Sequence, residues 1–173
     1  SVRRALVLAA LVNGATFATF AYLGVIATGV LPAGAVPGLL AAFGGGAFLG
    51  VTAAGRLGGG WLVVGGVCAL PLGWAALALA ATHAVPLFVL AVVLGGLSFG
   101  VGSTLVGRVM HVAAHAPSLS GAFATVALNV GAFAGPLLAG AVTGTTGDYR
   151  DAAWVSAGLA ATAIVLVARR TRD

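Results

Sequence analysis

The sequence predicts an all-α integral membrane protein with six transmembrane helices. Three observations lead to this fold class: apolar stretches of membrane-spanning length, a lack of charge within them, and arginines in alternate connectors. Of the 173 residues, 61% are hydrophobic and 6% are charged, and the mean hydropathy is +1.15. Soluble domains carry about 25% charged residues. A soluble globular core is therefore excluded.

Each apolar stretch is close to the length that a membrane helix needs, which is about 20 residues for a hydrocarbon core about 30 Å thick. In lipid, a helix satisfies every backbone hydrogen bond within its own segment. The predicted helices are, in order, Ala5–Ala27, Val36–Ala54, Gly60–Ala80, Pro86–Val106, Leu119–Thr143 and Ala152–Ala168. None of them contains an aspartate, glutamate, lysine or arginine.

The arginines lie at the helix ends and predict the orientation. They precede the first helix, separate the second from the third and the fourth from the fifth, and follow the sixth: Arg3, Arg4, Arg56, Arg108, Arg169, Arg170 and Arg172. The remaining connectors hold no charge, or His83, or Asp148, Arg150 and Asp151. Because arginine and lysine are enriched in cytoplasmic loops, we expect both termini in the cytoplasm and the protein in the cell membrane, plasma or inner.

Composition also bears on other classes of function. A net charge of +5 is common in nucleic-acid-binding proteins, but these arginines are spread over helix ends, so no nucleic-acid partner is predicted. His111 and His115 are four residues apart, and zinc needs three or four ligands, so we expect no metal site and no cofactor. An enzyme is not predicted, because the histidines of the cytoplasmic turn, His111 and His115, fall on the opposite side of the membrane from Asp148 and Asp151.

Two segments repeat with an offset of 85 residues, from Gly46 to Gly131. Residues 46–50 read GAFLG and residues 131–135 read GAFAG, and each copy lies in the second helix of a triplet. Three helices per unit would place two units in opposite membrane orientations. The sequence therefore predicts two inverted three-helix repeats, residues 1–84 and 85–173. The alternative is a chance match in a chain with 28 glycines.

Glycines four residues apart share one helical face. Such pairs are Gly46 with Gly50, Gly96 with Gly100, and Gly131 with Gly135. Small residues at this spacing let helix backbones approach closely in lipid, so Gly46, Gly131 and Gly135 are predicted to pack helices together. Replacing Gly131 or Gly135 by leucine is expected to disrupt assembly, and Leu39→Ala, at a connector end, is expected to matter less.

Two motifs resemble a known family. Gly50, Gly55 and Arg56 resemble the glycine-rich, arginine-bearing cytoplasmic turn of the major facilitator superfamily. Residues 113–120, AAHAPSLS, run on to Asn129 and the glycines of residues 131–135. This pattern resembles the penultimate helix of proton-coupled drug efflux proteins of the chloramphenicol-resistance and arabinose-efflux type.

The resemblance covers nearly the whole chain, and it implies the C-terminal half of a twelve-helix transporter. The implied partner is an N-terminal six-helix half of the same protein. In the family the turn usually continues with an acidic residue and another basic one, where this chain has glycines at positions 58–60. The charge-relay role of that turn is therefore not carried over to Arg56.

Polar side chains at membrane depth are candidates for contact with substrate, because polar groups in lipid are costly and tend to face a cavity. Asn13, Phe17 and Phe20 recur on one face of the first helix, and Asn129 and Phe133 are about one turn apart in the fifth. Amide and aromatic groups together suit a neutral amphipathic ligand. The alternative is hydrogen bonding between helices. In the family, these two helices line the cavity, which favours the substrate interpretation.

The combined interpretation is half of a secondary active transporter that exports small hydrophobic, chloramphenicol-like compounds by alternating access, as a drug:proton antiporter. It implies a role in antibiotic resistance. No acidic residue lies in a predicted helix, so the proton-carrying group is expected in the other half. A start at Ser1 agrees with a segment of a longer chain. The alternative is a non-transporting six-helix structural or regulatory subunit.

The predicted topology can be checked by single-cysteine labelling after Cys68 is replaced by serine. Cysteines at positions 33, 83 and 147 should react with an impermeant maleimide from outside the cell. Those at positions 57 and 113 should react only after the membrane is permeabilised. A mixed or reversed pattern would contradict the arrangement of six helices with cytoplasmic ends.

Overall fold

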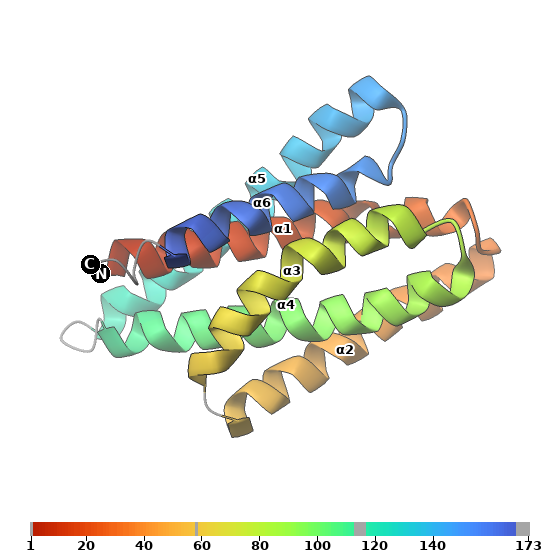
Figure 1. Ribbon diagram of the computed structural model, residues 1–173. Helices are drawn as coiled ribbons and strands as arrows, with labels where there is room; N and C mark the ends of the chain where they lie inside the picture. Colours follow the sequence, from red (N-terminus) through yellow and green to blue (C-terminus); the bar gives the residue numbers. More distant parts are fainter. Residues whose placement is uncertain (1, 58, 113–116, 169–173) are drawn as a thin grey trace.

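The structure, a computed structural model, describes residues 2–57, 59–112 and 117–168, and this part of the chain is helical without any strand (Figure 1). Its α-helices are α1 (Val2–Thr28), α2 (Val36–Leu57), α3 (Gly59–Ala80), α4 (Ala84–Val112), α5 (Pro117–Thr146) and α6 (Asp151–Ala168), and the short 3-10 helix η1 (Ala33–Ala35) precedes α2. Six helices in the described chain are long and apolar enough to cross a membrane. The predicted all-α membrane fold is confirmed at this level.

Every α-helix is longer than its predicted apolar stretch. Arg3 and Arg4 lie in the first turn of α1, Arg56 in the last turn of α2, and Arg108 within α4, two residues beyond the end of the predicted apolar stretch. The expectation that these arginines occupy connectors is therefore wrong. Hydropathy detects only the segment inside the hydrocarbon, whereas a helix continues into the headgroup region at no loss of backbone hydrogen bonds.

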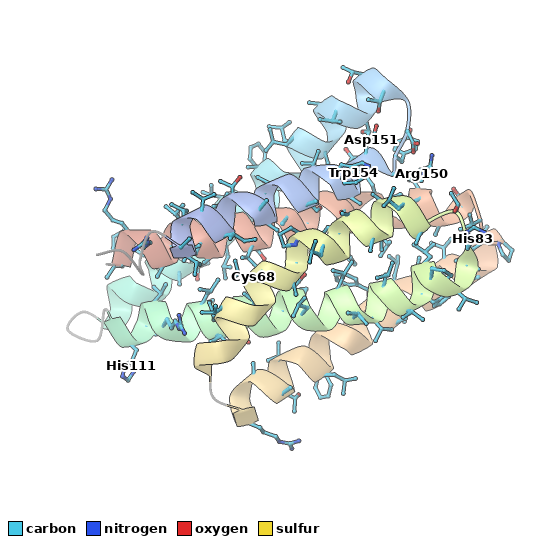
Figure 2. The ribbon with its side chains drawn as sticks, viewed as in Figure 1. Cys68, His83, His111, Arg150, Asp151 and Trp154 are labelled. Carbon is cyan, nitrogen blue, oxygen red and sulfur yellow. The ribbon has the colours of Figure 1, made fainter. Side chains whose placement is uncertain are left out.

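The helices form two layers. Contacts place α5, α1, α4 and α2 side by side in that order, and α6 and α3 cover one face of this row (Figure 1). The first residues of α1 and the last residues of α2 and α4 lie at one end of the bundle, which we call the arginine end. His83, Arg150 and Asp151 lie at the other end, the far end (Figure 2).

The core is built mostly from small and branched side chains, together with the buried aromatic rings of Trp74 and Phe43. Trp74 of α3 is 1% exposed, and leucines and valines from α1, α3 and α4 surround it in the main cluster. Leu39 is fully buried in the same cluster, so the expectation that it lies at a connector end is wrong, and the predicted mild effect of Leu39→Ala loses that basis. It lies only one turn inside α2, but it faces the core rather than a connector. Large apolar side chains also cover the outer surface, as a lipid environment requires, for example Leu72 and Leu79.

Glycines lie where α2 and α4 approach most closely. A Cβ atom built at Gly46 would overlap the carbonyl oxygen of Val92, and one built at Gly50 would overlap that of Gly96. At Gly96 a Cβ atom would lie 3.1 Å from the carbonyl oxygen of Gly46. The two backbones are therefore in direct contact, and no side chain fits between them.

The same contact recurs between α5 and α1. A Cβ atom at Gly131 would overlap the carbonyl oxygen of Ala10, and one at Gly135 would overlap that of Gly14. In both helix pairs the two carbonyl oxygens are four residues apart, and both pairs run parallel in the bundle. The two repeated glycine motifs thus pack in the same way, each against the first helix of the other triplet.

Gly50→Ala and Gly135→Ala should each destabilise the protein by about 1–3 kcal/mol, because a methyl group forces the backbones apart. The matched control is Gly65→Ala in α3, where an added Cβ atom meets nothing within 4 Å. That change should be neutral or stabilising by up to about 1 kcal/mol, since alanine is the better helix former. The three variants are made in the intact natural protein, and their melting temperatures in detergent test these expectations. Equal behaviour of the three variants would show that these contacts do not limit stability.

Candidate functional site

Asn13, the first predicted route residue, is engaged with a neighbouring helix. It is half-buried on α1, and its Nδ2 atom donates to the carbonyl oxygen of Leu128 on α5 at 2.6 Å. An amide that bonds a backbone carbonyl across two helices stabilises their packing. The structure thus places Asn13 against Leu128, the residue before Asn129. Its hydrogen bond joins two helices, as the alternative interpretation described.

The predicted phenylalanines of α1 belong to a row of aromatic rings. The rings of Phe17 and Phe20 meet edge to face with centroids 6.0 Å apart, and Phe20 lies 4.9 Å from Phe43 of α2. Phe43 in turn meets Phe99 of α4 edge to face at 6.3 Å. Phe43 and Phe99 were not singled out from the sequence, because their contact joins helices that are distant in the chain. The row connects α1, α2 and α4 through the core.

Asn129 and Phe133 lie on the outer surface of α5. Phe133 is 72% exposed, Asn129 is exposed, and the glycines that contact α1 occupy the other face of the helix. The five predicted route residues are therefore divided between the core and the surface. None of them lines either of the two cavities described below.

A buried hydroxyl pair joins α1 to α6. Thr19 Oγ1 and Ser156 Oγ share a hydrogen bond of 2.5 Å, and both hydroxyls also lie within reach of the carbonyl oxygen of Ala152. Thr19 is 1% exposed and Ser156 is fully buried. Sequence analysis did not select Ser156, although a serine in an otherwise apolar helix was the available signal.

The predicted turn motif borders a cavity at the arginine end. The cavity has a volume of about 500 Å³, and we call it the arginine-end cleft. Its lining comes from the ends of α2 and α4: Val51, Ala54, Gly55, Ser103, Thr104, Gly107, Arg108 and His111. Gly55 of the motif is in the lining, Gly50 instead contacts α4, and Arg56 is exposed at the end of α2.

A second cavity, of about 620 Å³, opens at the far end between α1, the α3–α4 turn and the α5–α6 connector. Within it, Arg150 holds Asp148 by an ion pair of 2.7 Å and by a backbone N–H bond of 2.9 Å. The side-chain hydrogen bond from Arg150, followed by its backbone N–H, lowers the pKa of Asp148 below its usual value of 3.8. The pair fixes the start of α6. Tyr149 stacks on Tyr22 with centroids 6.1 Å apart.

The titratable side chains are separated along the bundle. His111 lies at the arginine end, and His83, Arg150 and Asp151 lie at the far end (Figure 2). Among the described residues, no three histidine, cysteine, aspartate or glutamate side chains are close enough to hold a metal ion. His115, the proposed neighbour of His111, lies outside the described residues.

Comparison with known proteins gives one informative relative. The chain is 45% identical, over 168 residues, to the chloramphenicol resistance protein of Streptomyces lividans. The match covers 94% of this chain and 43% of the relative, so the chain spans less than half the length of that protein. No family model and no solved structure matches the chain.

Asn13→Ala should lower stability by about 0.5–1.7 kcal/mol, because it removes a hydrogen bond between two membrane helices. Thr162→Ala is the control, since it removes an exposed hydroxyl of α6 that bonds only within its own helix. The melting temperatures of the two purified variants measure the difference. An unchanged melting temperature for Asn13→Ala would show that the bond to Leu128 is dispensable.

Arg150→Gln should destabilise the protein at neutral pH and have little effect in acid. The lowered pKa of Asp148 means that this carboxylate stabilises the fold above its usual pKa, and that the stabilisation disappears as pH falls through the lowered value. The melting temperatures of the wild type and the variant should therefore converge below about pH 4. Because both side chains are partly exposed, we expect a small effect. Asp148→Asn in the same background should add nothing further at neutral pH; an additional loss would contradict the pairing.

Proposed function

We propose that this chain is one half of a secondary active transporter that exports small hydrophobic compounds, chloramphenicol-like drugs among them, and so supports antibiotic resistance. The observation that carries the proposal is the 45% identity to a chloramphenicol resistance protein across 94% of the chain. The chain spans 43% of that relative, and the proposal includes an N-terminal six-helix half that completes the transporter. Transport, not catalysis, is the proposed activity.

The packing of the two triplets supports an inverted repeat of the major facilitator type. Exchange of residues 1–84 with residues 85–173 turns the contact of α2 with α4 into that of α5 with α1. The glycines in these contacts are offset by 85 residues, and each copy meets carbonyl oxygens four residues apart. Transporters that work by alternating access are often built from two structurally equivalent units that pack around a common centre.

The position of Asn129 supports a second half. The residue lies near the middle of α5, which is long enough to span a membrane, and its amide is exposed. An amide at that depth is costly in contact with lipid. We propose that this face of α5, with Phe133, meets the other half and the drug route. Under this proposal, the face of α5 is supported from α1 by Asn13, Phe17 and Phe20.

The mechanism we propose is drug:proton antiport with the arginine end in the cytoplasm of a cell-membrane protein. The arginines of α1, α2 and α4 gather at that end, as the positive-inside bias predicts. The acidic group that carries the proton is assigned to the other half. Movement of one half against the other then opens the route to each side in turn.

The test is proton-driven chloramphenicol transport in inverted vesicles. The intact natural protein should transport, residues 1–173 alone should insert without transport, and co-expression with the preceding part of the protein should restore activity. Asn129→Ala should weaken drug affinity about two- to tenfold, which is the effect of one lost hydrogen bond. Transport by residues 1–173 alone would contradict the half-transporter. Failure of the intact protein to bind or transport drug would favour a structural or regulatory subunit instead.

A further inference from the structure

We propose that the arginine-end cleft binds the headgroup of an anionic phospholipid. The proposal concerns a site away from the predicted drug route, and it does not require transport activity. It rests on the shape of the cleft, on the basic side chains in and beside it, and on the apolar surface that continues from it.

The shape follows from the way α2 and α4 separate. Backbone contact holds the helices together at Gly46 and Gly50, but at Gly55 and Gly107 an added Cβ atom would meet nothing within 4 Å. The helices therefore diverge over their last turns, and the cleft of about 500 Å³ opens between them. Glycine at both positions leaves room for a bulky headgroup.

The charge of the cleft is basic on the α4 side. Thr104, Arg108 and His111 follow one another at intervals of four and three residues, so they share a face of α4 and line the cleft together. Arg56, next to the lining residue Gly55, is exposed at the end of α2. The described aspartates, Asp148 and Asp151, both belong to the far end. A phosphodiester in the cleft would meet the basic side chains of Arg108 and His111, with Arg56 at the neighbouring helix end.

The hydroxyl groups of the lining already donate their hydrogen bonds within α4, so they are not assigned to the phosphate. Ser103 and Thr104 both donate to the carbonyl oxygen of Gly100, at 3.0 and 2.9 Å. Arg108 already makes an interaction within the protein, and the five N–H donors of a guanidinium allow it to hold a phosphate as well. Arg108 and His111 are therefore the assigned ligands of the headgroup.

Apolar surface beside the cleft accounts for a lipid rather than a soluble anion. Val51 of α2 lines the cleft and is 43% exposed. This apolar side chain lies beside the basic ones, so an acyl chain can lie along α2 while the headgroup occupies the end of the helix. Basic pockets between helices at the cytoplasmic side are places where anionic lipid headgroups bind. The positive-inside bias explains arginines at this end, but it does not explain an open cleft between them.

The experiment measures lipid binding to the intact natural protein by native mass spectrometry, with phosphatidylglycerol titrated against phosphatidylcholine. Arg108→Gln should weaken phosphatidylglycerol binding about fivefold, which corresponds to about 1 kcal/mol for one basic side chain at an anionic membrane surface. The matched control is Arg3→Gln, which removes the same charge at the same end of the bundle but outside the cleft. It should leave binding unchanged.

A second pair of variants keeps every charge. Gly107→Leu should fill the cleft and weaken phosphatidylglycerol binding, whereas Gly102→Leu on the same helix should not, because it is equally open but outside the lining. If Arg108→Gln fails to fold, this pair still decides the question. Equal losses in the cleft variants and their controls, equal binding of phosphatidylcholine, or displacement of the lipid by millimolar inorganic phosphate would each overturn the proposal; the last would indicate a site for soluble anions.

Discussion

Direct contact between helix backbones at glycine holds this bundle together. Lipid is as apolar as the side chains, so the hydrophobic effect does not drive these helices against each other, and close van der Waals contact has to do so. Dispersion attraction falls steeply with distance, and glycine allows the shortest approach. We call the backbone contacts at Gly46–Gly50 and at Gly131–Gly135 the two seams. They supply that close approach in two helix pairs, each of which runs parallel. Helices α3 and α6 pack against these two helix pairs.

The seams also decide where polar groups can lie. A seam leaves no space for a side chain, so hydrogen bonds between helices occur beside it: Asn13 with Leu128 next to the α1–α5 seam, and Thr19 with Ser156 between α1 and α6. The arginine-end cleft and the far-end cavity both open towards the ends of the bundle, where the helices diverge. Charged side chains of the described chain lie at those ends, and the middle is closed by aromatic and aliphatic packing.

This arrangement is relevant to the proposed transport. The predicted route residues do not enclose a pocket within this chain, since Phe20 packs into the core and Phe133 faces outward. Under the proposed function, the pocket forms only when the exposed face of α5 meets the second half. The row from Phe17 to Phe99 joins α1, α2 and α4 through the core. Under the proposed function, movement takes place between the halves rather than within one.

Composition and spacing were sufficient for the class of fold, the number of membrane-length helices and the order in which they follow one another, because hydropathy over about 20 residues is a local property. The spacing of Gly46 and Gly50, or of Gly131 and Gly135, was equally visible in the sequence. Their partners were not, because a pair of glycines four residues apart marks a smooth face without specifying which helix covers it. Only the tertiary structure decided that Gly50 meets Gly96 and that Gly135 meets Gly14. For the same reason the burial of Leu39, the bond from Asn13 to Leu128 and the exposure of Asn129 depended on the fold: each is set by what lies opposite the residue in space, and that contact is made by a segment distant in the chain.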